Sequence, residues 1–89
     1  MNLPQVDVVH HPDRSRFEAE VDGRLAYLDY RRAGDTVVMP HTVVPREIEG
    51  RGVAGELTRT AVAWARDHSL EIDAQCSYVR SWLAKHPDA

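Results

Sequence analysis

The sequence predicts an α+β fold with one mixed, largely antiparallel sheet, in the element order ββββαβα, with a βαβ crossover and two helices. Three observations predict it: alternating apolar residues in the first half, helically spaced apolar residues from position 53, and a short apolar strand after that helix. With 89 residues, we expect a single domain spanning 1–89. A chain of this size leaves room for a ligand groove rather than a deeply enclosed cavity.

The first half of the chain alternates apolar and polar residues, which is typical of half-buried strands. Val6–His10 is expected to form a short first strand, and Arg16–Val21 a second strand whose apolar residues share one face. Asp22 and Gly23 follow as a favoured two-residue turn. The turn predicts a hairpin in which Arg24–Arg32 returns antiparallel.

The next strand, Thr36–Val44, is rich in β-branched residues but contains Pro40. Because proline has no backbone N–H, within a sheet it belongs at an edge or a bulge. We therefore expect this strand to be kinked or splayed at Pro40, and a splay would open a slot beside His41.

The second half predicts a helix from Val53 to about His68, with apolar residues at three- and four-residue spacing. Glu71–Cys76 follows as a short strand. Strand, helix and strand in this order form a βαβ crossover, which makes the two strands parallel.

The last predicted helix is Ser77–Lys85, with Ser77 as a plausible N-cap and Pro87 beyond its end. Trp64 and Trp82 lie at core spacing in the two helices. We expect both indoles to anchor the core with one edge near solvent.

Composition argues against several classes of function. The net charge of −3 gives no general attraction for nucleic acid, and no apolar run reaches the ~20 residues that span a bilayer. The start of the chain lacks the features of a signal peptide, so we expect a cytoplasmic protein. We also expect it to be a monomer or a weak homodimer. Cys76 alone cannot form an intrachain disulfide, and His10 and His11 lack metal ligands at suitable spacing. We expect no metal site.

Three glycines, Gly50, Gly52 and Gly55, join the Pro40 strand to the following helix. Glycine allows tight turns and close approach of a ligand to the backbone, while the first helical amides have no intrahelical acceptor. No Ser, Thr, Asp or Asn stands at the expected cap position. The loop is therefore a candidate anion site, and the alternative is a connection whose glycines serve tight packing.

The stretch Glu49–Ala54 resembles the acetyl-CoA pyrophosphate loop of the GNAT superfamily of N-acetyltransferases, whose pattern is Arg or Gln, two residues, Gly, one residue, then Gly or Ala. Gly52 and Ala54 match this pattern, and Glu49 departs from it at the first position. The chain also resembles a family of small, stand-alone GNAT-like proteins, which shares the motifs His41-Thr42, Cys76-Ser77-Tyr78-Val79 and His86-Pro87. Val43 departs from that family, which commonly has an acidic residue there.

The resemblance implies an acetyl-CoA-dependent N-acetyltransferase. One strand would bind pantetheine through its backbone, and the amides at the start of the helix would bind pyrophosphate. The residues so implied are His41, Thr42, Val43 and Val44 for pantetheine, and Arg51, Gly52, Val53, Ala54 and Gly55 for pyrophosphate.

Three side chains are candidates for catalysis. Cys76 ends a predicted parallel strand, where ligands gather, and could accept the acyl group or act as an acid; its alternative is a small buried residue. Tyr78 could protonate the leaving thiolate, or merely pack the last helix. His41 could take a proton from the attacking amine, or be a structural histidine.

The first functional hypothesis is acetyl transfer to an unidentified amine, by direct attack in a ternary complex or through Cys76. A second hypothesis is a non-catalytic module that binds CoA or acyl-CoA. A third is a protein-interaction domain that uses an exposed sheet face.

Overall fold

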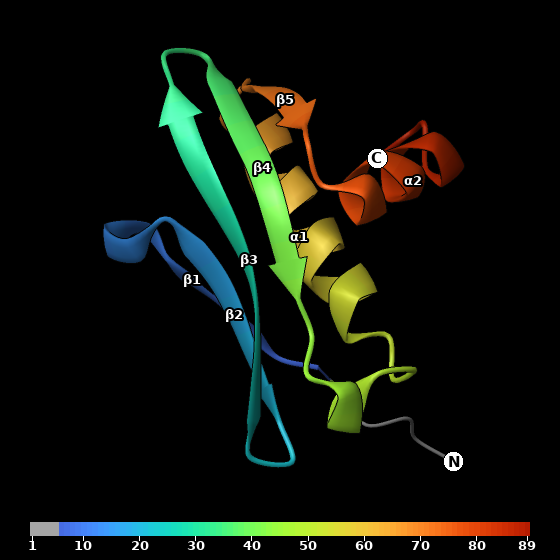
Figure 1. Cartoon of the computed structure of the whole chain (residues 1–89). Coiled ribbons are helices and arrows are strands. Elements are labelled where there is room, and N and C mark those ends of the chain that lie inside the picture. The colour runs from blue at the N-terminus through green and yellow to red at the C-terminus, as the bar shows by residue number, and fades with distance from the viewer. Residues whose placement is uncertain (1–5) are drawn as a thin grey trace.

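The computed structural model describes residues 6–89 and confirms the predicted α+β class and element order (Figure 1). The first strand lies slightly later than predicted, and the last strand ends two residues earlier. The elements are β1 Val8–His11, β2 Arg16–Val21, β3 Arg24–Ala33, β4 Thr36–Val43, α1 Val53–Asp67, β5 Glu71–Ala74 and α2 Ser77–Lys85, with 3₁₀ turns at Pro12–Arg14 and Arg46–Ile48.

The strands form one sheet in the order β1-β2-β3-β4-β5. The first three pairs are antiparallel, and β4 and β5 are parallel because α1 connects them as a crossover. Figure 1 shows α1 behind the sheet and α2 beside β5. No helix among residues 6–89 is long and apolar enough to cross a membrane.

The core lies between the sheet and α1. Phe17, Leu28, Leu57 and Ala61 are all buried there, as their spacing in strand and helix predicts. Trp64 packs against this core, but Trp82 lies outside it and stacks on His86 with ring centroids 4.1 Å apart. The prediction that Trp82 anchors the core was wrong. Helical spacing shows which residues share a face of the helix, but not which part of that face packs against the sheet.

The predicted irregularity at Pro40 is confirmed by the pairing of β3 with β4. Asp29 lies opposite His41 and Arg31 lies opposite Val38, so β4 contains one extra residue between these pairs. A bulge of this kind reverses the alternation of side chains beyond it. As a result, the strand that presents Met39 to the core continues with His41 on the opposite face.

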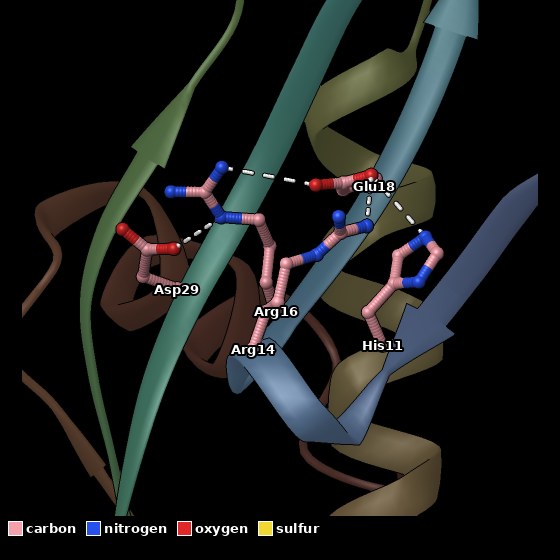
Figure 2. A network of polar contacts seen from close by, with 5 residues as sticks. All are labelled: His11, Arg14, Arg16, Glu18 and Asp29. Atoms are coloured by element: carbon pink, nitrogen blue, oxygen red, sulfur yellow. Dashed lines mark hydrogen bonds and ion pairs between the residues drawn. The ribbon is translucent and has the colours of Figure 1, made fainter.

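The face of β1, β2 and β3 opposite α1 carries a network of charged side chains (Figure 2). Arg16 donates to Asp29 at 2.7 Å and lies 3.7 Å from Glu18, which also contacts His11 and Arg14 at 3.2 Å each. These pairs connect three strands by polar contacts. They give the open face the solvated character expected from the glutamates of β2.

Candidate functional site

A slot opens where β4 and β5 separate. The two strands pair only from Thr36 to Met39 on β4, and the Cys76 N–H then donates to the Met39 carbonyl at 2.9 Å. Beyond this point β4 continues beside β3, whereas the chain after Cys76 turns into α2. The backbone edge of β4 that faces β5 therefore has no strand partner from Pro40 onward within the described residues.

The loop between β4 and α1 is anchored at its middle. Ile48 is fully buried, and Arg51 forms an ion pair with Asp22 of the β2–β3 turn. Gly50 and Gly52 adopt left-handed backbone conformations, with φ of 80° and 77°. Because only glycine enters this region readily, these two positions explain how the chain turns sharply into the helix.

The start of α1 has no side-chain cap. Gly52 is the N-cap residue, and the first helical bond runs from the Glu56 N–H to the Gly52 carbonyl at 3.1 Å. The preceding amides of Val53, Ala54 and Gly55 consequently have no intrahelical acceptor and lie at the positive end of the helix dipole. This end of α1 can bind an anion through its backbone alone.

Cys76 is the N-cap residue of α2, so the predicted cap at Ser77 was wrong by one position. Its thiol lies 3.5 Å from the Thr42 hydroxyl, across the slot. Burial by itself would raise the pKa of the Cys76 thiol, but hydrogen bonds from Thr42 and from the amides of Val79 and Tyr78 outweigh it and lower the pKa below its ordinary value. The fold thus favours the thiolate, which is the nucleophilic form.

Tyr78 lies at the junction of the two helices. It is 42% exposed, while the neighbouring Val79 is buried and supplies the packing of α2. A Cβ atom added to Gly55 would lie 3.4 Å from the Tyr78 hydroxyl oxygen. The phenol therefore borders the same helix start that offers the free amides.

His41 and Thr42 point to opposite faces of β4. Thr42 is paired with the buried Leu28 and faces Cys76, whereas His41 is exposed and lies opposite Asp29 on the open face. The structure therefore brings Thr42 and Cys76 together across the slot and places Tyr78 beside the start of α1, but it turns His41 away from Cys76. Val43 shares the open face with His41.

A cavity of about 930 Å³ lies on the other side of the loop, toward β1 and β2. Glu56, Arg59 and Thr60 of α1 line it together with Gly50–Gly52 and Val21. Sequence reasoning did not find this cavity. The only signal in the sequence was weak, namely that Glu56, Arg59 and Thr60 share one side of a helix. The opposite wall comes from strands far away in the chain, which this spacing does not reveal.

The far end of α1 carries an aromatic cluster, which we define as His10, Phe17, Tyr30, Trp64 and His68. His10 stacks on Phe17 at 4.1 Å between ring centroids, and its Nε2 lies 2.6 Å from the Tyr30 hydroxyl. Burial lowers the pKa of His10, and the neighbouring His11 and His68 lower it further. Burial also raises the pKa of Tyr30. The packing of the cluster therefore disfavours the charged forms of His10 and Tyr30.

The chain is similar in sequence to a known family and to several known proteins. A family model described as GCN5-related N-acetyl-transferase matches residues 16–89. Protein NATD1 of Xenopus tropicalis is 29% identical over 92% of this chain and 78% of its own length. Protein NATD1 of Gallus gallus is 28% identical over 92% of this chain and 77% of its own. Protein NATD1 of Homo sapiens is 28% identical, with 92% and 75% covered.

Proposed function

The chain belongs to the GCN5-related N-acetyltransferase family, and we propose that it transfers an acetyl group from acetyl-CoA to a primary amine. One observation carries the proposal: α1 starts without a side-chain cap, and its Gly55 lies next to Tyr78, in the helix that follows the separation of β4 and β5. Free amides at a helix start bind phosphate, and an unpaired strand edge can bind an amide-containing chain. Coenzyme A has both parts, a pyrophosphate and a pantetheine.

In this proposal the pyrophosphate binds the amides from Arg51 to Gly55, and pantetheine lies along the backbone of His41–Val44. The glycine conformations support the first assignment because they leave those amides uncovered by side chains. The bulge at Pro40 supports the second, because it accompanies the separation of β4 from β5. Glu49 is exposed and takes no part.

Direct transfer requires a base for the amine and an acid for the leaving sulfur. The amine nitrogen attacks the thioester carbonyl carbon and gives its proton to His41. The C–S bond then breaks, and its electron pair stays on the CoA sulfur. Tyr78 donates a proton to that sulfur. His41 lies on β4 and Tyr78 lies on α2. This arrangement suits two groups of which one acts on the amine and the other on the leaving sulfur. Backbone amides polarise the carbonyl.

A second route passes the acetyl group through Cys76. The thiolate attacks the carbonyl carbon, CoA leaves as its thiolate, and the acetylated cysteine then transfers the group to the amine. The lowered pKa of Cys76 supports this route. Intact-mass spectrometry with acetyl-CoA and no amine distinguishes the two: an acetyl adduct that Cys76→Ser abolishes indicates the covalent route, and its absence indicates direct attack.

A thermal-shift titration with acetyl-CoA, CoA and ATP tests the proposal. A ligand that binds only the folded state stabilises it by about 2.7 kcal/mol at one hundred times its Kd. We expect the melting temperature to rise with the CoA species and to change much less with ATP, which has adenine and phosphates but no pantetheine. Equal indifference to all three ligands would contradict CoA binding.

A non-catalytic CoA-binding module is the second candidate, because Val43 stands on the open face where an acid would otherwise lie near the acceptor. It predicts a thermal shift without release of free CoA thiol in the presence of a broad amine panel. A protein-interaction domain, the third hypothesis, predicts no response to CoA at all.

A further inference from the structure

The open face of the sheet beside His41 is the surface from which an amine reaches the proposed base. His41 of β4 is exposed and lies opposite Asp29 of β3. Val43, two residues further along β4, is 40% exposed and lies opposite Tyr27. Because residues two apart in a strand share a face, Val43 and Tyr27 border the space in front of His41. An amine that gives its proton to His41 therefore lies next to them.

Two carboxylates, Asp29 and Glu18, are level with His41 and Val43 in the sheet, and both are already paired with basic groups (Figure 2). Arg16 Nε donates to Asp29 at 2.7 Å, and Arg16 Nη1 lies 3.7 Å from Glu18. Glu18 also has two further basic neighbours at 3.2 Å each. These contacts leave the surface beside His41 close to neutral.

Glu20 is the next carboxylate along β2 on this face. It lies opposite Leu25, two strands and two residues away from Val43, which is about 12 Å by ordinary strand spacing. Exposed charges at that distance are largely screened at physiological ionic strength. Within the described residues, β2 and β3 therefore offer no free carboxylate to an ammonium group in front of His41.

This charge arrangement determines which amines can react readily. An aliphatic amine, with a pKa close to the ~10.4 of a lysine side chain, is almost fully protonated at neutral pH. In that form it has no lone pair for attack, and as a cation beside Arg16 it meets no free carboxylate. The nitrogen lone pair of an aromatic amine is delocalised into its ring, so this amine is uncharged at neutral pH. It can enter this surface and attack without first losing a proton.

Apolar side chains are exposed on the same part of the face. Leu25 precedes Tyr27 by two residues on β3 and is 43% exposed, similar to Val43. The guanidinium carbon of Arg16 lies 3.9 Å from the centroid of the Tyr27 ring and covers one side of that ring. Val43, Tyr27 and Leu25 together form what we call the apolar strip. A flat ring can pack against such a strip.

Resting on the proposed function, we propose that the acceptor is a small aromatic primary amine and that Val43 determines this specificity. The ring of the amine lies on the apolar strip, and its amino group points toward His41. The step is the one described above. The nitrogen forms a bond to the acetyl carbon and gives one proton to His41, while the C–S bond breaks and the CoA sulfur is protonated by Tyr78. A carboxylate at position 43 would instead favour amines that arrive as cations.

The test uses two isomers, 4-methylaniline and benzylamine, which contain the same atoms but differ in the charge of the amino group at neutral pH. Spermidine serves as a polycation. The acetylated products are quantified by liquid chromatography with mass spectrometry, which gives kcat/KM for each amine at saturating acetyl-CoA. The proteins compared are the wild type, Val43→Glu, Val43→Gln and Val9→Glu.

Two of these variants are matched controls. Val43→Gln has the shape of the glutamate variant without its charge. Val9→Glu places the same charge on the same face, but on β1, with β2 and β3 between it and β4. Val9 is 53% exposed and Val43 is 40% exposed, so none of the substitutions should disturb the fold.

We expect the wild type to prefer 4-methylaniline over benzylamine and spermidine by at least ~10-fold in kcat/KM. Val43→Glu should reduce this ratio to about 2 or less, because its carboxylate pairs with the ammonium group and can take its proton. Val43→Gln and Val9→Glu should keep the wild-type ratio. A wild type that prefers benzylamine or spermidine would overturn the inference while confirming transfer to amines.

An unchanged ratio in Val43→Glu, or an equal fall in Val43→Gln, would likewise overturn the role of Val43 and leave the proposed function intact. Absence of acetylated product with all three amines would overturn the proposed function and this inference with it.

Discussion

The two ends of α1 differ in almost every physical respect. At the C-terminal end, Trp64 packs within the aromatic cluster, in which His10 Nε2 and the Tyr30 hydroxyl form a hydrogen bond. At the N-terminal end, Gly52 replaces a capping side chain and leaves backbone amides without a partner. One helix therefore has an end where aromatic rings pack against one another and an end whose backbone amides are open to a ligand.

The two ends explain how so small a chain can combine stability with ligand binding. Apolar burial and ring contacts at one end hold α1 on the sheet, so the other end need not contribute a cap to stability. A glycine at the N-cap costs roughly a few tenths of a kcal/mol relative to a good capping side chain, and a bound anion can recover it. The comparison predicts that stability and CoA binding respond to different substitutions.

Trp64→Ala should have the largest effect, on stability alone. Removing this indole from the aromatic cluster should lower the free energy of unfolding by about 3 kcal/mol, since it leaves a cavity among packed rings. Urea denaturation measures the loss, and CoA affinity of the folded fraction should be unchanged. Trp82→Ala is the control: it removes an indole that stacks only on His86, and should cost less than ~1 kcal/mol.

Gly52→Val should have the next largest effect, mainly on binding. We expect CoA affinity to fall at least ~100-fold, because a branched side chain covers the helix amides and the left-handed backbone must shift. Gly34→Val is a matched control, since Gly34 also has a positive φ and no atom near its missing Cβ. Both variants should lose about 1–2 kcal/mol of stability. Similar CoA affinity in the two variants would argue against the amide site.

Thr42→Val should have a smaller effect, confined to the reactivity of Cys76. Loss of the hydroxyl removes a hydrogen bond that lowers the pKa of the thiol, so the pKa rises and less thiolate is present at neutral pH. The rate of iodoacetamide alkylation, followed against pH, should shift its midpoint upward. Thr42→Ser keeps the hydroxyl and should resemble the wild type. Identical profiles for both variants would contradict a role for this contact.

The double substitution His10→Phe and Tyr30→Phe should change only the pH dependence of stability. Burial lowers the pKa of His10 in the folded state below its unfolded value of ~6.5, so the unfolded chain binds this proton more readily. Stability from His10 is therefore complete above that pH and falls as the pH drops below it. The double variant, which leaves no buried hydroxyl unpaired, should lose less stability between neutral and mildly acidic pH. If the melting temperatures of the wild type and the double variant change in parallel with pH, the role of His10 in this pH dependence is refuted.

Local patterns were sufficient for the order of the elements. The period of two in β2, the Asp22-Gly23 turn and the helical spacing of α1 each depend on neighbours in the chain, and the structure has all three. Pro40 was also a reliable signal, because a missing N–H has the same consequence in any sheet. The glycine loop was placed correctly for the same reason: the backbone conformation of glycine is a local property.

The facing of the candidate site residues could not be predicted in this way. Simple alternation from Met39 would point His41 toward α1, and the bulge reverses it. The proximity of Cys76 and Thr42 depends on how far β5 pairs with β4 before the strands separate. These features are set by contacts between segments that lie far apart in the chain.

Consecutive residues suffice to specify the α+β class, the crossover, the break at Pro40 and a helix start without a capping side chain, because each follows from local conformational preferences. Contacts between distant segments determine that Trp64 and not Trp82 anchors the core, that Cys76 occupies the N-cap position of α2 near Thr42, and that a cavity adjoins the loop. The physical reason is that periodicity reports which residues can share a face, whereas register and packing decide what that face meets.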